Sequence, residues 1–306
     1  MTKTSANLPQ RILITGGTGL VGTRLSELLK ARGCEVTHLS RRPTDKNHSS
    51  FHWDVKKQVV DEQAIKEAEA IIHLAGASVA GKRWNENWKK EIYTSRIDST
   101  RLLLKMVKEH NPAIKHFISA SAIGYYGWDT GDKWVDEETP KGDGFLADVV
   151  GDWEQEVVRF KEIGVKNACL RVGIVLSKEG GALVEMAKPI KMGAGAALGS
   201  GKQYMSWIHL DDLCHMFIYI LENELEGIYN GTSPNPVTNM TLTKQLAKAL
   251  KRPLFLPNVP PFMLRLIVGE MATVLTGGNK VSSKKIEKAG FVFQHPLLHS
   301  TLKALY

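Results

Sequence analysis

Cysteine is scarce in this sequence. The 306 residues include only Cys34, Cys169 and Cys214, which are far apart and form no Cys-x-x-Cys pair. Their number and spacing exclude a disulfide framework and a cysteine-based zinc site. All three lie in apolar stretches, so we expect buried thiols. The ten histidines are spread along the chain, and because zinc needs several ligands at one point, we expect no metal site.

Long apolar runs are also missing. Residues 1–10 are polar, and the longest apolar stretch, residues 260–275, is interrupted by Arg265 and Glu270. A signal peptide and a membrane-spanning helix both need an uninterrupted apolar core. We therefore expect a cytoplasmic protein with no membrane partner. We expect residues 260–275 to pack against the rest of the chain rather than against another protein.

Acidic residues are too few to balance the basic ones. The chain has 40 Lys and Arg against 32 Asp and Glu, which gives a formal net charge of +8. The basic pairs are scattered, and no helix-turn-helix or aromatic RNA-binding pattern accompanies them. We therefore expect solvated basic faces and no nucleic-acid partner. A few of these side chains can meet an anionic small molecule.

Strand-like and helix-like segments alternate in the first half of the chain. An apolar run at residues 11–15 precedes helical spacing at residues 20–31, and a second strand is predicted at residues 34–39. Further strands are predicted at residues 70–74, 116–120 and 167–171, separated by polar helical stretches at residues 85–110 and 148–163. This alternation is typical of an α/β fold with a Rossmann-like, doubly wound parallel sheet.

The pattern changes after about residue 175. Residues 177–206 are rich in glycine, and we expect there a loop-rich insertion that can act as a lid. We assign residues 10–237 to the Rossmann-like domain, including this insertion. Residues 238–306, in which prolines separate two or three predicted helices, form a smaller and mainly helical lobe that contributes to the substrate cleft.

Three glycines follow the first predicted strand at the spacing G-x-x-G-x-x-G. They precede a predicted helix, whose first N–H groups are unpaired and whose amino terminus carries a partial positive charge. Because glycine has no side chain, a diphosphate can approach the backbone closely. The sequence therefore predicts a dinucleotide site made by Gly16, Thr18, Gly19, Leu20, Val21 and Gly22.

The end of the second predicted strand indicates which dinucleotide binds. A site that selects the free ribose hydroxyl usually carries an acidic residue there, whereas this chain has Ser40, Arg41 and Arg42. Guanidinium groups suit a 2′-phosphate, so we expect NADP(H) in preference to NAD(H). Asp54, where we expect a further strand between residues 39 and 70 to end, is a candidate partner for the adenine amino group. The arginines pointing to solvent, and Asp54 as a surface residue, remain the alternatives.

These residues resemble the extended short-chain dehydrogenase/reductase superfamily. Thr15-Gly-Gly-Thr-Gly-Leu-Val-Gly22 resembles its nucleotide fingerprint, and His73-Leu-Ala-Gly-Ala77 the segment that lines the cofactor after the fourth strand. From about residue 10 to the end, the chain is similar to an uncharacterised NAD(P)-dependent epimerase-like family with a carboxy-terminal domain of unknown function (DUF1731-type). The motifs that carry this similarity are Arg83-Trp84, Ser95-Arg-Ile-Asp-Ser-Thr100, Ser119-Ala-Ser-Ala-Ile-Gly-Tyr-Tyr-Gly127, Asp152-Trp-Glu154, Trp207-Ile-His-Leu-Asp-Asp212, Gly269-Glu-Met-Ala272 and Ala289-Gly-Phe291. The resemblance implies that Leu74, Ala75, Gly76, Ala77 and Ser119 also line the cofactor.

The resemblance implies a catalytic serine, tyrosine and lysine, often with an asparagine. Ser121 falls at the serine position. Leu146 falls where the tyrosine belongs and Val150 where the lysine belongs, and neither side chain can carry a proton. Arg96 falls at the asparagine position. This chain therefore departs from the superfamily at its proton-transfer residues.

Tyr125 and Tyr126, a turn beyond Ser121, are the candidate replacements. Without a neighbouring cation, a tyrosine is a better proton donor than base at neutral pH. The possible cationic neighbours are Arg83, Arg96 and Arg171. The alternatives are that both tyrosines are packing residues, and that Arg96 forms a salt bridge within its helix with Glu91 or Asp98.

Two functions from different classes remain. The first is an NADP(H)-dependent epimerase or oxidoreductase that acts on a small polar metabolite, with Ser121 holding the reacting oxygen and Tyr125 or Tyr126 donating a proton. The second is a catalytically silent NADP(H)-binding redox sensor that regulates a protein partner. By resemblance only, the helices at residues 85–110 and 148–163 imply a possible homodimer.

Overall fold

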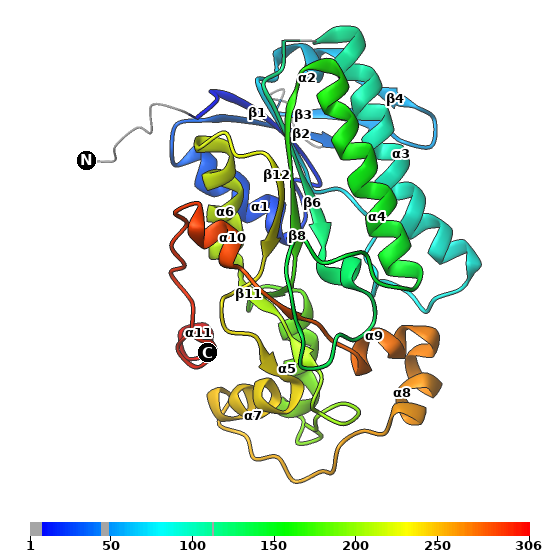
Figure 1. Ribbon diagram of the computed structural model, residues 1–306, viewed down its shortest axis with the longest axis vertical. Helices are drawn as coiled ribbons and strands as arrows, with labels where there is room; N and C mark the ends of the chain where they lie inside the picture. The colour runs from blue at the N-terminus through cyan, green and yellow to red at the C-terminus, as the bar shows by residue number, and fades with distance from the viewer. Residues whose placement is uncertain (1–7, 44–48, 112) are drawn as a thin grey trace.

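Eight strands form one sheet in the order β12-β8-β6-β5-β1-β2-β3-β4 in the computed structural model (Figure 1). The structure describes residues 8–43, 49–111 and 113–306, so residues 1–7 of the polar amino-terminal segment lie outside the described part. The strands are β1 (Arg11–Thr15), β2 (Glu35–Ser40), β3 (Ser50–Asp54), β4 (Val59–Val60), β5 (Ala70–His73), β6 (His116–Ala122), β8 (Lys166–Val172) and β12 (Gly227–Gly231). All neighbours run parallel except β3 with β4. The predicted α/β, Rossmann-like fold is confirmed.

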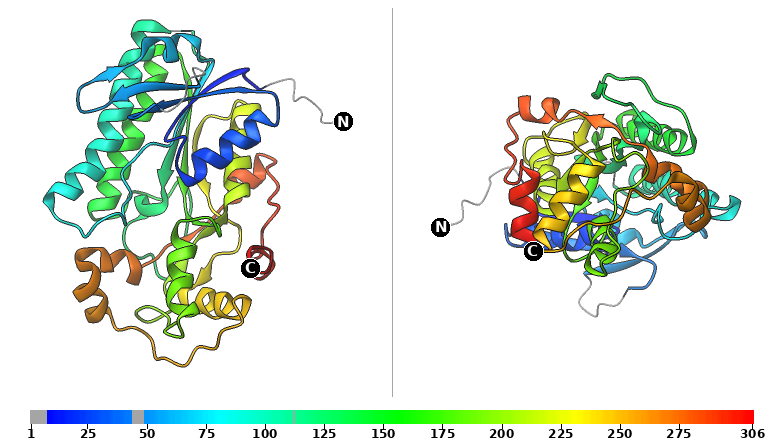
Figure 2. Two further views of the ribbon diagram at one scale, coloured as in Figure 1. Left: turned by 180° about the vertical axis from the view of Figure 1, so that it is seen from behind. Right: turned by 90° about the horizontal axis from the view of Figure 1, so that it is seen from below.

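Helices cover both faces of this sheet (Figures 1 and 2). One face carries α1 (Leu20–Lys30) and α6 (Leu210–Glu222), and the other carries α2 (Glu62–Glu67), α3 (Glu86–His110) and α4 (Phe145–Val158). Because side chains alternate along a strand, β1 supplies both cores. Ile12 and Ile14 pack in the cluster with α1 and α6, whereas Leu13 packs in the cluster with α3 and α4.

The segment expected to be loop-rich contains a helix, α5 (Ala182–Lys191). Its Leu183, Ala187 and Ile190 recur at helical spacing and are buried in a third cluster with Leu242 and Leu246. Packing of this apolar face outweighs the glycines on either side. The strands outside the main sheet are short: β7 (Trp134–Val135), β9 (Ile174–Leu176), β10 (Tyr204–Met205), β11 (Trp207–His209), β13 (Val237–Thr238) and β14 (Lys280–Val281).

The carboxy-terminal region holds five α-helices where two or three were predicted. They are α7 (Asn239–Ala249), α8 (Pro261–Val268), α9 (Ala272–Thr276), α10 (Lys284–Lys288) and α11 (Leu298–Leu305). Most are too short for a hydrophobic period to reveal them. The 3₁₀ helices are η1 (Ile123–Tyr126), η2 (Arg159–Ile163) and η3 (Gly269–Met271). The region is joined to the rest of the chain by a short parallel ladder between β14 and β7.

Residues 260–275 pack on the rest of the chain only in part. Met271 contacts the core on the α3 and α4 side, but Phe262 and Leu266 are 63% and 74% exposed. Gly269 ends α8 with a φ of 68°, so the apolar residues before and after it do not share one face. Within α8, Leu264 is buried, so the prediction of packing holds there and is wrong for Phe262 and Leu266.

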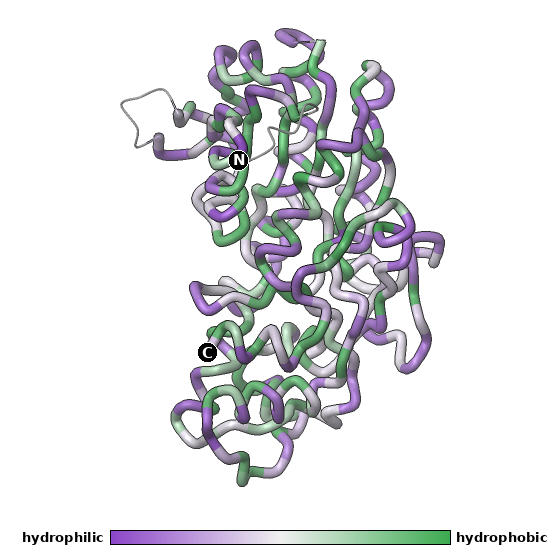
Figure 3. Tube along the Cα trace, turned by 90° about the vertical axis from the view of Figure 1, so that its left-hand side faces the viewer, coloured by the Kyte–Doolittle hydropathy of each residue, from purple (hydrophilic) through white to green (hydrophobic). Residues whose placement is uncertain are grey.

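Apolar and polar stretches alternate throughout the chain in Figure 3. Among the described residues, no helix combines the length and the apolar character needed to cross a bilayer. All three cysteines are buried free thiols, as predicted.

Candidate cofactor and active site

The glycine turn between β1 and α1 is shaped for close backbone approach. Gly16 has a φ of 70°, and a Cβ there would lie 3.0 Å from the backbone of Leu74 and Ala75. A Cβ on Gly22 would lie 2.3 Å from the Gly16 carbonyl oxygen. Both positions therefore require glycine. Gly17, which the sequence analysis did not single out, has the same need, because a Cβ there would lie 2.4 Å from the His38 ring.

The amino terminus of α1 is available to an anion. Its N-cap, Gly19, provides no side-chain hydrogen bond, and the first turn contains no acidic residue. The first N–H groups of a helix have no intrahelical partner. Thr18 and Gly19 are exposed, Leu20 and Val21 are half-buried, and Gly22 is buried beneath the turn. This is the geometry that a diphosphate group needs.

A buried hydrogen-bond network holds the segment after β5 against this turn. The Thr15 hydroxyl accepts from the backbone N–H groups of Leu74 and Ala75, at 3.2 Å each, and lies 2.7 Å from His73 Nδ1. His73 Nε2 lies 3.1 Å from the Ser99 hydroxyl. Burial lowers the pKa of His73 to about 3, so the ring is neutral. Its Nδ1 then accepts a hydrogen bond from the Thr15 hydroxyl. Gly76 is exposed at the end of this segment.

The groups expected around the adenosine end lie at the ends of β2 and β3. Arg41 and Arg42 are exposed, and neither forms a salt bridge with another residue of the described ranges. The Ser40 hydroxyl accepts from the Arg42 N–H at 3.2 Å. Asp54 accepts from the N–H groups of Lys56 and Lys57 in a turn.

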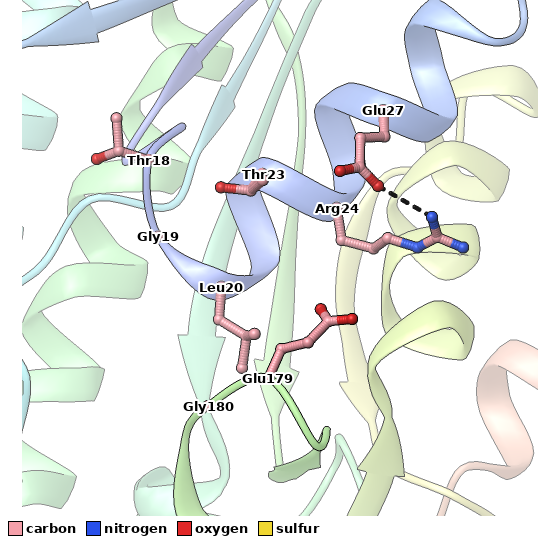
Figure 4. Close-up of a pocket in the computed structure, with 8 residues that line it drawn as sticks. All are labelled: Thr18, Gly19, Leu20, Thr23, Arg24, Glu27, Glu179 and Gly180. Carbon is pink, nitrogen blue, oxygen red and sulfur yellow. Dashed lines mark hydrogen bonds and ion pairs between the residues drawn. The ribbon is translucent and has the colours of Figure 1, made fainter. Parts of the chain in front are cut away.

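A pocket of about 310 Å³ opens beside the turn (Figure 4). It is lined by Thr18, Gly19, Leu20, Thr23, Arg24, Glu27, Glu179 and Gly180. The Arg24 guanidinium is held by Asp211 at 2.7 Å and by Glu27 at 3.0 Å. Leu20 points toward the loop that carries Glu179. The segment predicted to act as a lid therefore begins next to the amino terminus of α1.

Ser121 belongs to a buried polar cluster. It is 4% exposed, and its hydroxyl donates to Glu154 Oε1 at 2.5 Å. Glu154 also receives two hydrogen bonds from Arg171, each 2.8 Å long. The one hydrogen bond that the Ser121 hydroxyl can donate therefore goes to Glu154. Ser119, two residues before, is fully buried and donates to the Ala120 carbonyl.

The two candidate tyrosines differ in their surroundings. The Tyr126 hydroxyl is buried, donates to Asn230 Oδ1 at 2.8 Å and accepts from Arg171 Nη1 at 3.0 Å. Burial raises the pKa of Tyr126 to about 12. The Tyr125 ring lies against the Arg171 guanidinium, and its hydroxyl makes no hydrogen bond with any residue that the structure describes. Only Tyr125, which is partly exposed, has a hydroxyl free for a ligand.

Leu146 and Val150, at the tyrosine and lysine positions of the resemblance, contact the turn that carries Tyr125. A Cβ on Gly124 would lie 3.4 Å from Leu146 Cβ and 4.0 Å from Val150 Cγ2. The face of α4 nearest the candidate site is apolar at these positions. Leu146 and Val150 themselves have no group that can donate a proton.

Of the three candidate cations, Arg171 is the one that contacts the tyrosines. Arg83 lies against α8, where a Cβ on Gly269 would be 2.7 Å from its Nε. Arg96 Nη1 donates to the carbonyl oxygens of Ala77 and Ile92. The alternative that Arg96 forms a salt bridge with Glu91 or Asp98 is wrong. These two carboxylates pair with other residues, Glu91 with Lys56 and Asp98 with Arg101.

Several hydrogen-bond partners of Arg171 and Tyr126 were not predicted from the sequence. Glu154 and Asn230 are buried polar residues that meet Arg171 and Tyr126 across the sheet. The available signal was a charged residue, Arg171, inside an apolar strand, since a buried charge needs a partner. Among the described residues, no group of three or more His, Cys, Asp or Glu side chains is placed to hold a metal ion.

Comparison with known proteins shows the family of this chain. Residues 12–230 match the model of the NAD dependent epimerase/dehydratase family, and residues 259–305 match a domain of unknown function, DUF1731. The mouse protein named Epimerase family protein SDR39U1 is 35% identical over 298 residues, which cover 96% of this chain and 98% of the relative. Epimerase family protein SAOUHSC_00792 of Staphylococcus aureus is 35% identical over 300 residues, covering 97% and 99%.

A solved structure gives the same result. The crystal structure of human epimerase family protein SDR39U1 (isoform 2) with NADPH superposes with a TM-score of 0.87 at 32% identity, covering 96% of this chain and 98% of that one. Its likeness extends over the sheet and the carboxy-terminal helices alike. Fold, family model and relatives coincide over nearly the whole length, so this chain belongs to the NAD-dependent epimerase/dehydratase family, with a DUF1731 domain at its carboxy terminus.

Proposed function

We propose that this protein is an NADP(H)-dependent epimerase or oxidoreductase acting on a small polar metabolite. The observation that carries the proposal is the turn from Gly16 to Gly22, where three glycines bring the backbone close to an uncapped helix terminus. NADP(H) bound there would supply a hydride at C4 of its nicotinamide ring. The relative crystallised with NADPH supports this choice of cofactor.

The charge at the end of β2 favours NADP(H) over NAD(H). Arg41 and Arg42 are exposed and free of salt bridges to described residues, and Ser40 orders the backbone between them through its bond to the Arg42 N–H. An acidic residue would be needed to select the unphosphorylated ribose. Two guanidinium groups instead favour an additional phosphate.

Tyr125 is the residue proposed to donate a proton to the substrate. Its hydroxyl is free, whereas that of Tyr126 is held by Asn230 and Arg171. Arg171 lies against the Tyr125 ring and keeps a positive charge at this position. Ser121 donates its O–H hydrogen bond to Glu154, so it can receive a hydrogen bond from a ligand but has no second proton to donate to one.

The second candidate function is a redox sensor without turnover. It is favoured by the same cluster: the hydroxyl protons of Ser121 and Tyr126 are buried in hydrogen bonds to Glu154 and Asn230, and α4 presents Leu146 and Val150 at the site. A protein that binds NADP(H) and changes its affinity for a partner needs no free proton donor. A free Tyr125 hydroxyl is the feature that this function leaves unexplained.

One experiment separates the two functions. The purified protein is titrated with NADPH by calorimetry, and then incubated with NADPH and a panel of carbonyl compounds while absorbance of the reduced nicotinamide is followed. Turnover that is lost in Tyr125→Phe supports the enzyme. Tight NADPH binding without turnover of any compound supports the sensor, and no binding of either pyridine nucleotide at about millimolar concentration overturns both.

A further inference from the structure

We propose that Arg96 is an anion-binding residue of this site, which takes a carboxylate or phosphate group of the substrate beside the cofactor. The inference rests on the proposed function, because it assumes a ligand at the carboxyl edge of the sheet. It adds the chemical class of the substrate: a molecule with an anionic oxygen group. The same chemistry is present in the diphosphate of the cofactor, and the experiment below distinguishes these two sources.

Arg96 lies at the edge of the segment that borders the phosphate-binding turn. A Cβ on Gly76 would be 3.1 Å from its guanidinium carbon, and its Nη1 donates to the Ala77 carbonyl oxygen at 3.1 Å. Gly76 is exposed. The guanidinium thus lies against an exposed glycine that has no side chain, next to backbone that the Thr15 hydroxyl holds against Gly16.

The orientation of the guanidinium is set by its surroundings. Nη1 also donates to the Ile92 carbonyl oxygen at 2.9 Å, one turn back on α3. The guanidinium carbon lies 5.4 Å from the centroid of the Trp153 ring of α4. Arg96 is therefore held between α3 and α4 before any ligand arrives, so binding loses little side-chain entropy.

Two of the three nitrogen atoms remain available. Nε and Nη2 make no hydrogen bond or salt bridge with any residue in the described ranges. Together they form the planar pair of donors that suits two oxygen atoms of one anion. A lysine or asparagine at this position would not present such a pair.

The positive charge is also uncompensated. Arg171 is paired with Glu154, and Arg101, on the same helix as Arg96, is paired with Glu156. Arg96 has no carboxylate partner among the described residues, and burial lowers its pKa to about 10, which leaves it charged at neutral pH. A partly buried cation without a partner is costly, and an anionic ligand would remove that cost.

The test compares Arg96→Gln with Arg101→Gln, a control that removes a paired arginine from the same helix. Dissociation constants are measured by calorimetry for NADPH, for 2′,5′-ADP, and for inorganic phosphate added to the NADPH-saturated protein. We expect Arg96→Gln to weaken phosphate binding at least about tenfold, the loss typical of a charged hydrogen bond, and to leave NADPH affinity within about twofold. Arg101→Gln should change neither.

The other outcomes each decide the proposal. Weakened NADPH binding with unchanged 2′,5′-ADP binding assigns Arg96 to the cofactor diphosphate, which overturns the substrate assignment. Unchanged affinity for all three probes overturns anion binding altogether. If Arg96→Gln does not fold, Arg96→Lys, which keeps the charge but loses the planar pair of donors, is read in the same way.

Failure of the proposed function is separately visible. If the unmodified protein binds no NADPH, the cofactor assignment fails. The phosphate titration is then made on the free protein, where a loss of affinity in Arg96→Gln still supports an anion site and equal affinities reject it.

Discussion

The guanidinium carbon of Arg171 lies 3.4 Å from the centroid of the Tyr125 ring. The same guanidinium makes two hydrogen bonds to Glu154 and one to the Tyr126 hydroxyl. The single buried side chain of Arg171 therefore contacts both tyrosines and Glu154. The Glu154 carboxylate in turn accepts a hydrogen bond from the Ser121 hydroxyl. The contact leaves the Tyr125 hydroxyl without a partner among the described residues, which separates the roles of two adjacent and chemically identical side chains.

Replacing each tyrosine by phenylalanine should separate stability from activity. Tyr126→Phe leaves Asn230 Oδ1 and Arg171 Nη1 without the buried hydroxyl, so we expect the free energy of unfolding to fall by about 1–3 kcal/mol. Tyr125→Phe keeps the ring on Arg171 and should change stability by less than about 0.5 kcal/mol, while abolishing turnover. Denaturant unfolding and NADPH oxidation measure the two effects. Equal loss of stability in both variants would contradict the assignment.

The Glu154–Arg171 pair should be costly to break from one side. Arg171→Met leaves a carboxylate buried without its partner, and we expect a loss of about 3–5 kcal/mol in the free energy of unfolding. Adding Glu154→Gln should recover part of this loss, because the buried charge is then removed. Lys66→Met, which breaks an exposed pair with Glu62, should cost at most about 1 kcal/mol. The idea fails if the double variant is less stable than Arg171→Met.

His73 should make the protein less stable in mild acid. Its pKa is about 3 in the folded protein and near the ordinary value of 6.5 in the unfolded chain, so the unfolded chain takes up the proton first as the pH falls below about 6.5. Lowering the pH from about 7.5 to about 5.5 should therefore remove about 1.4 kcal/mol that is specific to His73.

The control for this effect is His73→Gln. Other histidines with lowered pKa values contribute the same dependence in both proteins, so only the difference between the two slopes is read. Free energies of unfolding at the two pH values give it. Parallel slopes would mean that folding does not lower the pKa of His73.

Arg41→Glu should reverse the cofactor preference. We expect NADPH binding to weaken by about 1.5–3 kcal/mol, the value of a charged hydrogen bond, with little change in NADH binding. Lys248→Glu makes the same change in net charge at an exposed position of α7 and should affect neither cofactor. Calorimetric titration with both nucleotides checks this. A similar loss for NADH and NADPH would remove Arg41 from the 2′-phosphate site.

Local patterns in the sequence determined the glycine turn and most of the sheet, but not β4 or β12. Strands and helices alternate with distinct periods, and Gly16 and Gly22 mark a place where side chains cannot fit. Both signals depend on residues close together in the chain, so they survive without knowledge of the fold. The short carboxy-terminal helices carry too few turns to produce such a period, and their number was wrong for that reason.

Only the tertiary structure decided which candidate residues are free to act. Ser121, Glu154 and Arg171 come from β6, α4 and β8, and Asn230 comes from β12. Neighbouring strands and the helix that covers them bring these residues within hydrogen-bonding distance, and the spacing of residues along the chain carries no record of that. Tyr125 and Tyr126 are equivalent in sequence, but packing buries one hydroxyl and leaves the other open. Packing also holds Arg96 of α3 without a carboxylate partner among the described residues.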